Sequence, residues 1–444
     1  MNASTLAGKS GPQPAASATP AQSAQAEDRL YAKVTRRLIT FLFIGYVFAF
    51  IDRTNVGFAK LGMQADLGFS EAVFGFGAGI FFVSYFLLEV PSNMMLARFG
   101  ARRWIARILI TWGLLSVATL MVKTPTQFYV VRFLLGAAEA GFFPGVMLYL
   151  TQWYPAQRRG RVITLFMAAI PVGSILGGIV SGWILSHFAS NSLLAGWQWL
   201  FLLEGAPAVI MGVIALWYLD DSIAQARWLS DAEKQVLQSH VAADQQQTVT
   251  HNVGQAMRSP LVWLLAVINF AFLAGVTLVF WMPSMLREAG VKDTVQIGWM
   301  VATPYALAVV GMLVLGRTSD RWRERRWHTV IPGLVCAAGL AVMPSAMGNP
   351  TLLLLASLAA LGGNVVGNAL YWNLPTAVLS GAAAAVGIAF INAFGQMAGF
   401  LGPTVFGKLF AMTGSPAAGL YLLSGVIALG SLSVLLISRS LVDR

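Results

Sequence analysis

Long apolar runs separated by short polar segments fill the chain from Leu38 to its C-terminus. Each run has about 20 residues, the length that an α-helix needs to cross the hydrocarbon core of a bilayer. The alternation of apolar and polar residues that is typical of half-buried strands is missing from them. The pattern predicts twelve transmembrane helices, with approximate extents of 38–59, 72–96, 104–122, 127–150, 162–186, 197–219, 261–284, 295–315, 329–347, 351–375, 386–410 and 417–437.

The longest polar segment, 220–259, divides these runs into six and six. We therefore expect an all-α membrane protein with twelve transmembrane helices in two six-helix bundles. A short amphipathic helix at 224–237 is expected to lie near the membrane surface. The first residues are rich in Ala, Ser, Pro and Gln, a composition that favours disorder. The predicted units are a disordered cytoplasmic tail (1–35), a first bundle (36–219), a cytoplasmic linker (220–259), a second bundle (260–438) and a cytoplasmic tail (439–444).

An internal repeat supports this division. The segment GARRW begins at Gly100 and RERRW begins at Arg323, which is 323 − 100 = 223 residues later. Both segments join the second and third predicted spans of their halves, so the halves are expected to be parallel repeats related by an axis along the membrane normal. The charged residues within the spans do not repeat at this offset, so any charge-dependent chemistry is predicted for the first half alone.

Composition and charge agree with a membrane protein. Hydrophobic residues make up 57% of the chain and charged residues only 11%, which excludes a soluble globular class. The net charge of +11 does not indicate a nucleic-acid partner, because the basic residues alternate by membrane side. Cytoplasmic loops are enriched in Lys and Arg, so both termini are predicted to be cytoplasmic. The basic loops carry Arg98, Arg102, Arg103, Arg107, Arg158, Arg159, Arg161, Arg317, Arg321, Arg323, Arg325 and Arg326, and the opposite loops carry Lys60, Lys123, Arg287 and Lys292.

Metal-dependent chemistry has no candidate ligands in this sequence. The single cysteine, Cys336, excludes a disulfide framework and a thiolate cluster. The four histidines are far apart and form no metal-spaced pair. We expect no metal, no cofactor and no enzymatic activity.

Four charged residues inside the predicted spans of the first half are the strongest functional candidates: Asp52, Arg53, Arg132 and Glu139. Ionised groups at bilayer depth are costly and mark ion or substrate pathways. A rise of about 1.5 Å per residue places Asp52, Arg53 and Arg132 at one level and Glu139 about 10 Å deeper. Guanidinium groups can hold an anion, and a desolvated carboxylate can bind a proton near neutral pH. Arg132 and Glu139 share one helix face. The alternative is a purely structural ion pair that locks neighbouring helices.

The remaining polar residues of the spans have simpler interpretations. Glu89, beside Pro91, and Glu204, ahead of Gly205, are expected to have structural roles near span ends or breaks. Neutral amides in the second half can be interhelical hydrogen-bonding groups. The neutral amides and aromatic residues of the second half are Asn269, Asn364, Asn368, Tyr371, Trp372, Asn373, Asn392 and Gln396.

Four motifs give the chain a clear resemblance to a known family. They are DRTNVGFA from Asp52, PSNMMLARFGARRW from Pro91, RFLLGAAEAGFFPG from Arg132 and GWQWLFLLEG from Gly196. They resemble the major facilitator superfamily, and within it the anion:cation symporter family of phthalate, tartrate, hexonate and 4-hydroxyphenylacetate permeases. The segment LFMAAIPVGSILGGIVSGWIL after Thr164 and the segment ERRWHT from Glu324 are especially similar to the 4-hydroxyphenylacetate branch.

This resemblance implies import of a small organic anion by proton symport with alternating access, in a bacterial inner membrane. Asp52 and Glu139 would be the proton-coupling residues, and Arg53 and Arg132 would bind substrate. Tyr85, Trp372 and Asn392 match positions that line the central cavity of that family, and Gln396 projects from the same helix face as Asn392. The expected partners are the organic anion, protons and the lipid bilayer, and we expect a functional monomer.

The resemblance also implies a cytoplasmic gate motif, present in both halves. Its first copy contains Arg98, Gly100, Arg102 and Arg103, but it has Asn93 and Ala97 where Gly and Asp are usual, so a latch through an acid of that copy is doubtful. The second copy contains the residues Gly316, Asp320 and Arg321.

The substrate class stays open between aromatic carboxylates, such as 4-hydroxyphenylacetate or phthalate, and sugar or dicarboxylic acids, such as tartrate. The alternatives within transport are an anion exchanger and a drug exporter. A membrane receptor or a membrane enzyme has less support, because the linker is short and no nucleophile stands beside a base.

Overall fold

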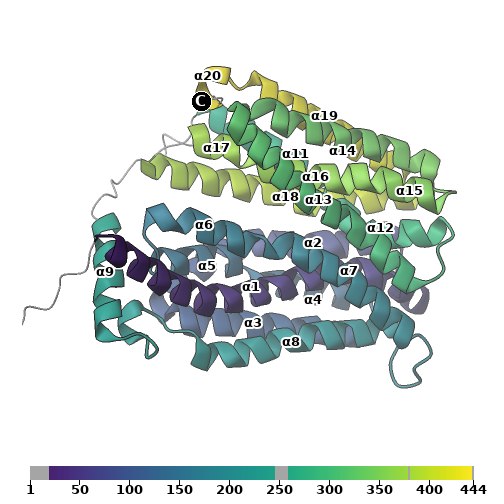
Figure 1. Cartoon of the computed structure of the whole chain (residues 1–444). Coiled ribbons are helices and arrows are strands. Elements are labelled where there is room, and N and C mark those ends of the chain that lie inside the picture. Colours follow the sequence, from purple (N-terminus) through teal and green to yellow (C-terminus); the bar gives the residue numbers. More distant parts are fainter. Residues whose placement is uncertain (1–19, 246–258, 379–380, 443–444) are drawn as a thin grey trace, which may run out of the picture.

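A computed structural model of the chain describes residues 20–245, 259–378 and 381–442, and these residues form helices without any strand (Figure 1). Twelve helical segments are long and apolar enough to cross a membrane, which confirms the predicted number. In the first half the helices are α1 (Pro20–Leu67), α2 (Glu71–Phe99), α3 (Ala101–Ala118), η1 (Thr119–Met121), α4 (Pro125–Glu139), α5 (Phe142–Thr151), α6 (Ala156–Met167), α7 (Ala169–His187) and α8 (Gly196–Tyr218).

The second half follows a short linker that contains η2 (Ile223–Gln225) and α9 (Asp231–Gln245). Several spans consist of two or more consecutive helices with a break between them, as in α4 and α5 or in α11 and α12. The helices of the second half are α11 (Pro260–Ala274), α12 (Thr277–Glu288), α13 (Thr294–Trp322), α14 (Arg326–Ala346), α15 (Pro350–Ser357), η3 (Leu358–Gly362), α16 (Gly363–Tyr371), α17 (Asn373–Val378), α18 (Gly381–Thr413), α19 (Ala417–Ser433), η4 (Val434–Leu436) and α20 (Arg439–Val442).

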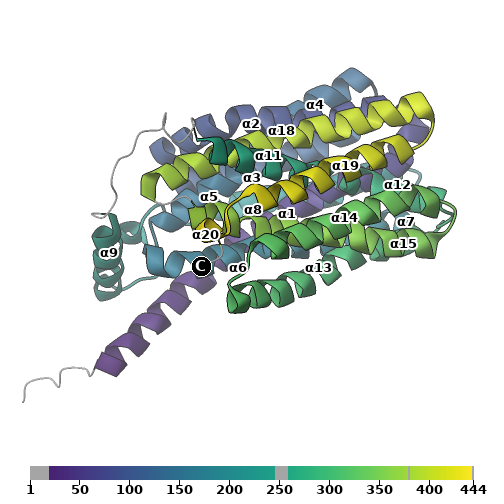
Figure 2. The same cartoon turned by 90° about the horizontal axis from the view of Figure 1, so that it is seen from above.

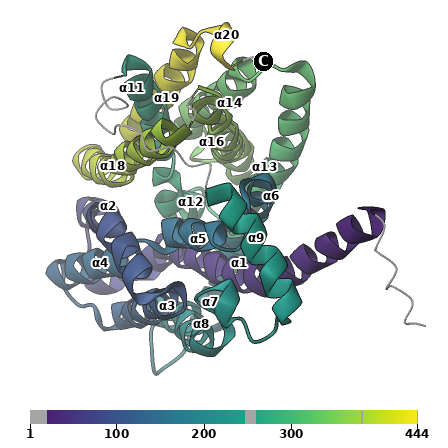
Figure 3. The ribbon, with the colours of Figure 1, turned by 90° about the vertical axis from the view of Figure 1, so that its left-hand side faces the viewer.

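The helices of each half gather into one bundle, and the two bundles lie side by side (Figures 1 and 3). The most extensive contacts between them join α2 with α18, α7 with α13, and α1 with α12. The start of α1, the linker helix α9 and the terminal helix α20 all lie at one end of the molecule, on the left of Figure 1. We call this end the linker face and the other end the opposite face.

Glycines allow the bundles to approach closely where they meet. A Cβ atom built on Gly75 of α2 would lie 2.4 Å from the carbonyl oxygen of Pro403 in α18. A Cβ atom on Gly182 of α7 would lie 2.4 Å from the carbonyl oxygen of Thr294 in α13. Both distances are too short for any side chain, so glycine is required for the observed contact between the two bundles.

The structure corrects three predicted boundaries. The first helix extends back to Pro20, so the expectation of disorder to residue 35 is wrong for 20–35, and residues 1–19 lie outside the described part of the chain. The buried side chains of Tyr31 and Val34 explain this extension, which projects beyond the bundles in Figure 2. The linker helix was expected at 224–237, but α9 begins at Asp231 and continues to Gln245. Lys60 lies inside α1 and is fully buried, whereas the sequence placed it in a loop.

The turns that follow α2 and α13 share an unusual backbone feature. Gly100 has φ 88° and Arg323 has φ 52°. These are the equivalent positions of the internal repeat, so each half turns from its second span to its third through a residue with positive φ. Only glycine adopts such angles without strain as a rule.

Candidate functional site

The fourth span is interrupted directly after Glu139, the last residue of α4. Ala140 has extended backbone angles, and Gly141 is left-handed with φ 86° before α5 begins. A Cβ atom at Gly141 would lie 2.3 Å from Ser92 Oγ, so both the backbone and the packing require glycine. Arg107 Nη1 of α3 donates to the carbonyl of Ala138 at 3.4 Å, which supplies a hydrogen bond beside the break. The break fixes the position of Glu139 in the interior of the bundle.

Glu139 forms an ion pair with Arg53 of α1. Arg53 Nη2 donates to Glu139 Oε1, while Glu139 Oε2 has no hydrogen-bond partner in the structure. The Glu139 side chain is 2% exposed and the Arg53 side chain is 24% exposed. The guanidinium group of Arg53 also lies 5.5 Å from the ring centre of Tyr85 and 5.0 Å from that of Phe50. Arg53 is therefore the more accessible partner of the pair.

Arg132 is buried without a carboxylate partner among the residues that the structure describes. Its Nε donates to the carbonyl oxygen of Gly77 at 3.3 Å, and its guanidinium group lies 4.9 Å from the ring centre of Phe81. Asp52 and Glu139 are close enough to act on it electrostatically. Removing the partner of a buried ion costs about 3–5 kcal/mol in proteins. A bound anion is the simplest compensation for this uncovered charge.

Asp52 is held by neutral donors that lie mainly on α3. Trp112 Nε1 donates to Asp52 Oδ2 at 3.0 Å, and Ser116 Oγ donates to Asp52 Oδ1. Asn55 Nδ2, one turn along α1, donates to Asp52 Oδ1 at 3.1 Å. Although Asp52 and Arg53 are neighbours in sequence, they engage different helices. The side chain of Asp52 is directed to α3 and that of Arg53 to the end of α4.

A family model described as Major Facilitator Superfamily matches residues 42–403. The chain belongs to the major facilitator superfamily. The protein is thus an integral membrane transporter rather than an enzyme.

Relatives and solved structures agree with this membership. The chain is 45% identical over 420 residues to a Pseudomonas putida protein named "Putative metabolite transport protein NicT", a match that covers 94% of this chain and 96% of that protein. It is 45% identical over 417 residues to an Agrobacterium vitis protein named "Putative tartrate transporter", with coverage of 93% and 96%. A solved D-xylose-proton symporter superposes with a TM-score of 0.72 at 15% identity over 90% of this chain and 97% of that one, a likeness that concerns the fold.

The geometry of this transporter differs from the predicted arrangement of charges. Arg53 pairs directly with Glu139, although the rise per residue placed them at different depths, because a long arginine side chain spans the difference. Arg132 and Glu139 share a helix and do not pair with each other. The pair that forms, Arg53 with Glu139, joins the neighbouring helices α1 and α4, which is what the structural alternative expected of an ion pair. Helices α1 and α4 meet through the Arg53 side chain.

The predicted substrate residues of the second bundle are partly exposed. Trp372 packs edge-on against Tyr371 with ring centres 5.5 Å apart, and Asn392 and Gln396 lie on α18. No hydrogen bond described in the structure joins Trp372, Asn392 or Gln396 to the charged residues of the first bundle. Their grouping with Tyr85 in one cavity stays a prediction.

Three other amides of the second bundle are buried with an unused acceptor. Asn269 donates to the carbonyl of Ile391 at 3.0 Å, but its Oδ1 has no partner. Asn364 and Asn368 also have an unpaired buried Oδ1. These two lie four residues apart in α16 and project from one helix face.

A buried polar cluster lies between the bundles, and the sequence pattern did not predict it. Lys60 Nζ donates to Glu71 Oε2 at 2.7 Å and to Ser284 Oγ of α12 at 3.2 Å. Trp281 Nε1 of α12 donates to the same Glu71 oxygen at 2.6 Å, and Gln64 Nε2 donates to Glu71 Oε1 at 2.9 Å. The cluster lies at the opposite face, where α1 ends and α2 begins. The residues directly after Lys60 are mostly apolar and continue the helix, and this pattern could have indicated that Lys60 lies inside α1 and not in a loop.

The first copy of the loop motif is latched by an acid from the linker. Asp221 Oδ1 accepts the backbone N–H of Arg102 at 2.8 Å, and Asp221 Oδ2 lies 3.7 Å from Arg102 Nε. Asp221 also packs against Gly100, where a Cβ atom would lie 2.5 Å from its Oδ1. Asp221 of the linker therefore supplies the acid that the motif lacks at position 97.

The second copy of the motif is arranged differently. Gly316 has open space around it, and Glu324 accepts hydrogen bonds from the backbone N–H groups of Trp327 at 2.7 Å and His328 at 3.1 Å. Although partial burial opposes ionisation, these hydrogen bonds and that with the His328 ring lower the pKa of Glu324. Arg98, Arg103, Asp320 and Arg321 have no ion-pair partner among the described residues.

Two further carboxylates of the first bundle, Glu204 and Glu89, take no part in these pairs. Glu204 is buried and accepts a hydrogen bond from Ser181 Oγ at 2.8 Å, which joins α8 to α7. Glu89 is partly buried within α2, which continues through Pro91 to Phe99. Glu89 is therefore not near a helix end, contrary to the expectation. Among the described residues no group of three His, Cys, Asp or Glu side chains is suited to hold a metal ion.

Proposed function

We propose that this transporter imports a small organic anion by proton symport in a bacterial inner membrane. The observation that carries the proposal is the buried Arg132, which lacks a carboxylate partner and lies near the ion pair of Arg53 and Glu139. An anionic substrate would supply the missing charge. The names of the bacterial relatives, which refer to metabolite and tartrate transport, are consistent with such a substrate.

Coupling follows from competition for Arg53. Its side chain is more exposed than that of Glu139, so an incoming carboxylate can reach the guanidinium group and displace the Glu139 oxygen. Glu139 would then be a buried carboxylate without its cation, and such a group binds a proton readily. Binding of the anion and binding of the proton would therefore favour each other.

Asp52 is proposed as a second proton-binding residue. It is buried and held only by neutral donors, so its protonation would not break an ion pair. Because Trp112 and Ser116 belong to α3, a change in the charge of Asp52 would alter the contact between α1 and α3. This gives a physical route from proton binding to helix movement.

Recognition of the rest of the substrate is assigned to neutral groups. Tyr85 lies beside Arg53, and we propose that Trp372, Asn392 and Gln396 complete the site from the second bundle. Aromatic rings and amides would bind the uncharged part of an organic acid, while Arg53 and Arg132 bind its carboxylate bidentately.

The alternating movement would require the contacts between the bundles to open and close. The cluster of Lys60, Glu71 and Trp281 joins the two bundles at the opposite face, and we propose that it is one of these contacts. At the linker face, the loop motif and its partner Asp221 would act as the cytoplasmic gate. We expect the protein to act as a monomer with both termini in the cytoplasm.

A ligand screen tests the substrate class. Purified protein is heated with a panel of aromatic, sugar-derived and dicarboxylic acids at two pH values, and the unfolding temperature is measured. We expect stabilisation by at least one carboxylate and none by its amide or alcohol analogue. Stabilisation by cationic or neutral drugs alone would favour an exporter, and uptake that requires an internal counter-anion would favour an exchanger.

A further inference from the structure

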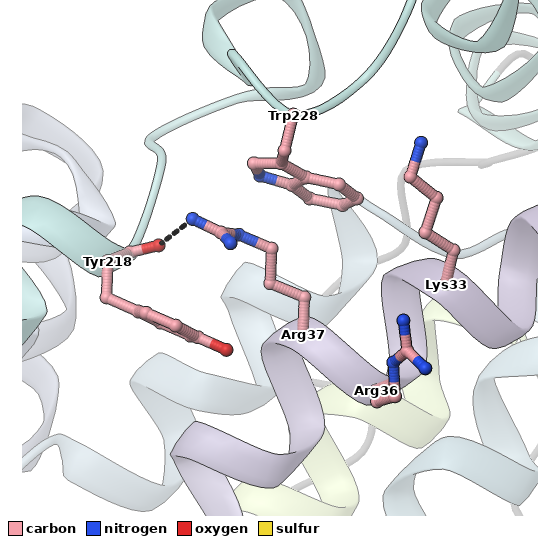
Figure 4. Close-up of a pocket in the computed structure, with 5 residues that line it drawn as sticks. All are labelled: Lys33, Arg36, Arg37, Tyr218 and Trp228. Carbon is pink, nitrogen blue, oxygen red and sulfur yellow. Dashed lines mark hydrogen bonds between the residues drawn. The ribbon is translucent and has the colours of Figure 1, made fainter.

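A basic cavity, separate from the charged residues of the candidate site, lies at the linker face (Figure 4). It has a volume of about 280 Å³ and is lined by Lys33, Arg36 and Arg37 of α1, by Tyr218 at the end of α8, and by Trp228 of the linker. These residues come from three separate segments of the chain. Three cations therefore converge on a cavity that the transport proposal does not use.

Two of these cations are not neutralised. Lys33 Nζ donates to both carboxylate oxygens of Glu233 at 2.9 Å, so its charge is balanced by α9. Neither Arg36 nor Arg37 has a carboxylate partner within the described part of the chain. Arg37 Nε is buried without any acceptor. The cavity thus has an excess of positive charge and an unused donor.

The aromatic residues hold Arg37 in place before any ligand binds. Its guanidinium group lies 4.5 Å from the ring centre of Tyr218 and 5.3 Å from that of Trp228, and Nη2 donates to the Tyr218 carbonyl oxygen at 3.4 Å. Trp228 is itself fixed, because its Nε1 donates to Asp220 Oδ2 at 2.8 Å and its ring stacks on Trp153 at 5.9 Å. A guanidinium group held in this way loses little conformational freedom on binding an anion.

The position of the cavity along α1 indicates the depth of its ligand. Lys33, Arg36 and Arg37 directly precede Leu38, where the apolar run of the first span begins. Cationic and amphipathic aromatic side chains at such a boundary lie at the level of the lipid headgroups. The distribution of basic loops predicts that this face is cytoplasmic, where basic pockets between helices bind anionic headgroups.

We propose that this cavity binds a phosphate group, with Arg36 and Arg37 as its ligands, and that the phosphate belongs to an anionic phospholipid of the cytoplasmic leaflet. A phosphodiester accepts bidentate hydrogen bonds from guanidinium groups. The bound lipid would connect α1, the end of α8 and the linker, and would stabilise the docking of the linker on the first bundle.

The test compares lipid binding by purified full-length protein and its variants. Native mass spectrometry and thermal unfolding are measured in detergent with added phosphatidylglycerol, with phosphatidylcholine, and with inorganic phosphate alone. We expect phosphatidylglycerol to be retained and to raise the unfolding temperature, and the double variant Arg36→Gln with Arg37→Gln to bind it about tenfold more weakly. The control Arg161→Gln, an exposed arginine of the same face, should bind like the wild type.

Each contrary outcome overturns a stated part of the proposal. If Arg161→Gln loses as much phosphatidylglycerol binding as the double variant, or if the double variant loses none, the cavity is not the binding site. Equal stabilisation by inorganic phosphate, without retention of phosphatidylglycerol, would assign it to a soluble phosphate. If the double variant fails to fold, the single variant Arg36→Gln is used instead, because the Arg36 side chain is exposed. Weaker binding of phosphatidylglycerol by Arg36→Gln would support the site, and unchanged binding would contradict it.

Discussion

Arg53 of α1 donates a hydrogen bond to the carboxylate of Glu139 at the end of α4, across 86 positions of the chain. One partner is partly exposed and the other is buried. In the proposed mechanism an anion would therefore reach the cation without first reaching the carboxylate, which a fully buried structural pair would not permit.

The first prediction concerns Glu139. Replacement by Gln keeps its shape but removes the charge that competes for Arg53 and the group that binds the proton. In proteoliposomes we expect pH-driven accumulation of substrate to fall by at least about tenfold, while counterflow exchange of the same substrate continues. The matched control is Glu204→Gln, another buried carboxylate, which should retain pH-driven uptake. Unchanged accumulation by Glu139→Gln would remove this residue from the proton path.

The second prediction concerns Arg132. Its replacement by Ala should weaken substrate binding by about 2–5 kcal/mol, a loss of roughly 30-fold or more, because the anion would lose a buried cationic partner. Arg132→Lys should bind more tightly than Arg132→Ala but less tightly than the wild type, since lysine keeps the charge without the bidentate geometry. Binding is measured by calorimetry on protein shown to be folded by its thermal transition. An affinity equal to that of the wild type would assign Arg132 a structural role.

The third prediction concerns the cluster at the opposite face, where burial is unequal. The Lys60 side chain is 0% exposed and the Glu71 side chain is 19% exposed. Glu71→Gln leaves a fully buried ammonium group without its counterion, whereas Lys60→Met leaves a carboxylate that still has donors from Gln64 and Trp281. We therefore expect Glu71→Gln to lower the unfolding temperature more than Lys60→Met does.

The double variant provides the check on this cluster. Combining Lys60→Met with Glu71→Gln removes the unpaired ammonium group, so the double variant should be more stable than Glu71→Gln alone. If the decrease in unfolding temperature of the double variant equals the sum of the two single decreases, the two residues do not depend on each other.

The fourth prediction compares the two copies of the loop motif. Gly100→Ala should destabilise the protein, because Gly100 has positive φ and a Cβ atom there would contact the carboxylate of Asp221. Gly316→Ala should be neutral or stabilising by up to about 1 kcal/mol, because Gly316 lies within a helix with open space around it. The measurement is thermal unfolding of both variants, and a similar effect at the two positions would contradict this distinction.

The number and type of elements could be predicted from the sequence, because a bilayer imposes length and apolarity on each span independently of its neighbours. The partners of individual side chains could not be predicted in this way. Counting the rise per residue placed Arg53 and Glu139 at different depths, since it ignores the reach of an arginine and the break after Glu139. Lys60 was assigned to a loop because a lone lysine at the end of an apolar run looks like a span boundary, and only the folded structure shows its partner on the other bundle.

Asp221 illustrates the same limit. The loop motif lacked an acid at Ala97, and the sequence offered no reason to search 124 residues further on (221 − 97 = 124). The packing of the linker against the turn at Gly100 supplies that acid.

The most direct test of proton symport is uptake by wild-type protein in proteoliposomes under an imposed pH gradient, with the membrane potential held at zero. Vesicles free of internal substrate are diluted into acidic medium that contains a radiolabelled carboxylate identified by the ligand screen. The proposal predicts accumulation above the external concentration that is abolished by a protonophore. Equilibration without accumulation, or accumulation only when the vesicles are preloaded with a counter-anion, would contradict it.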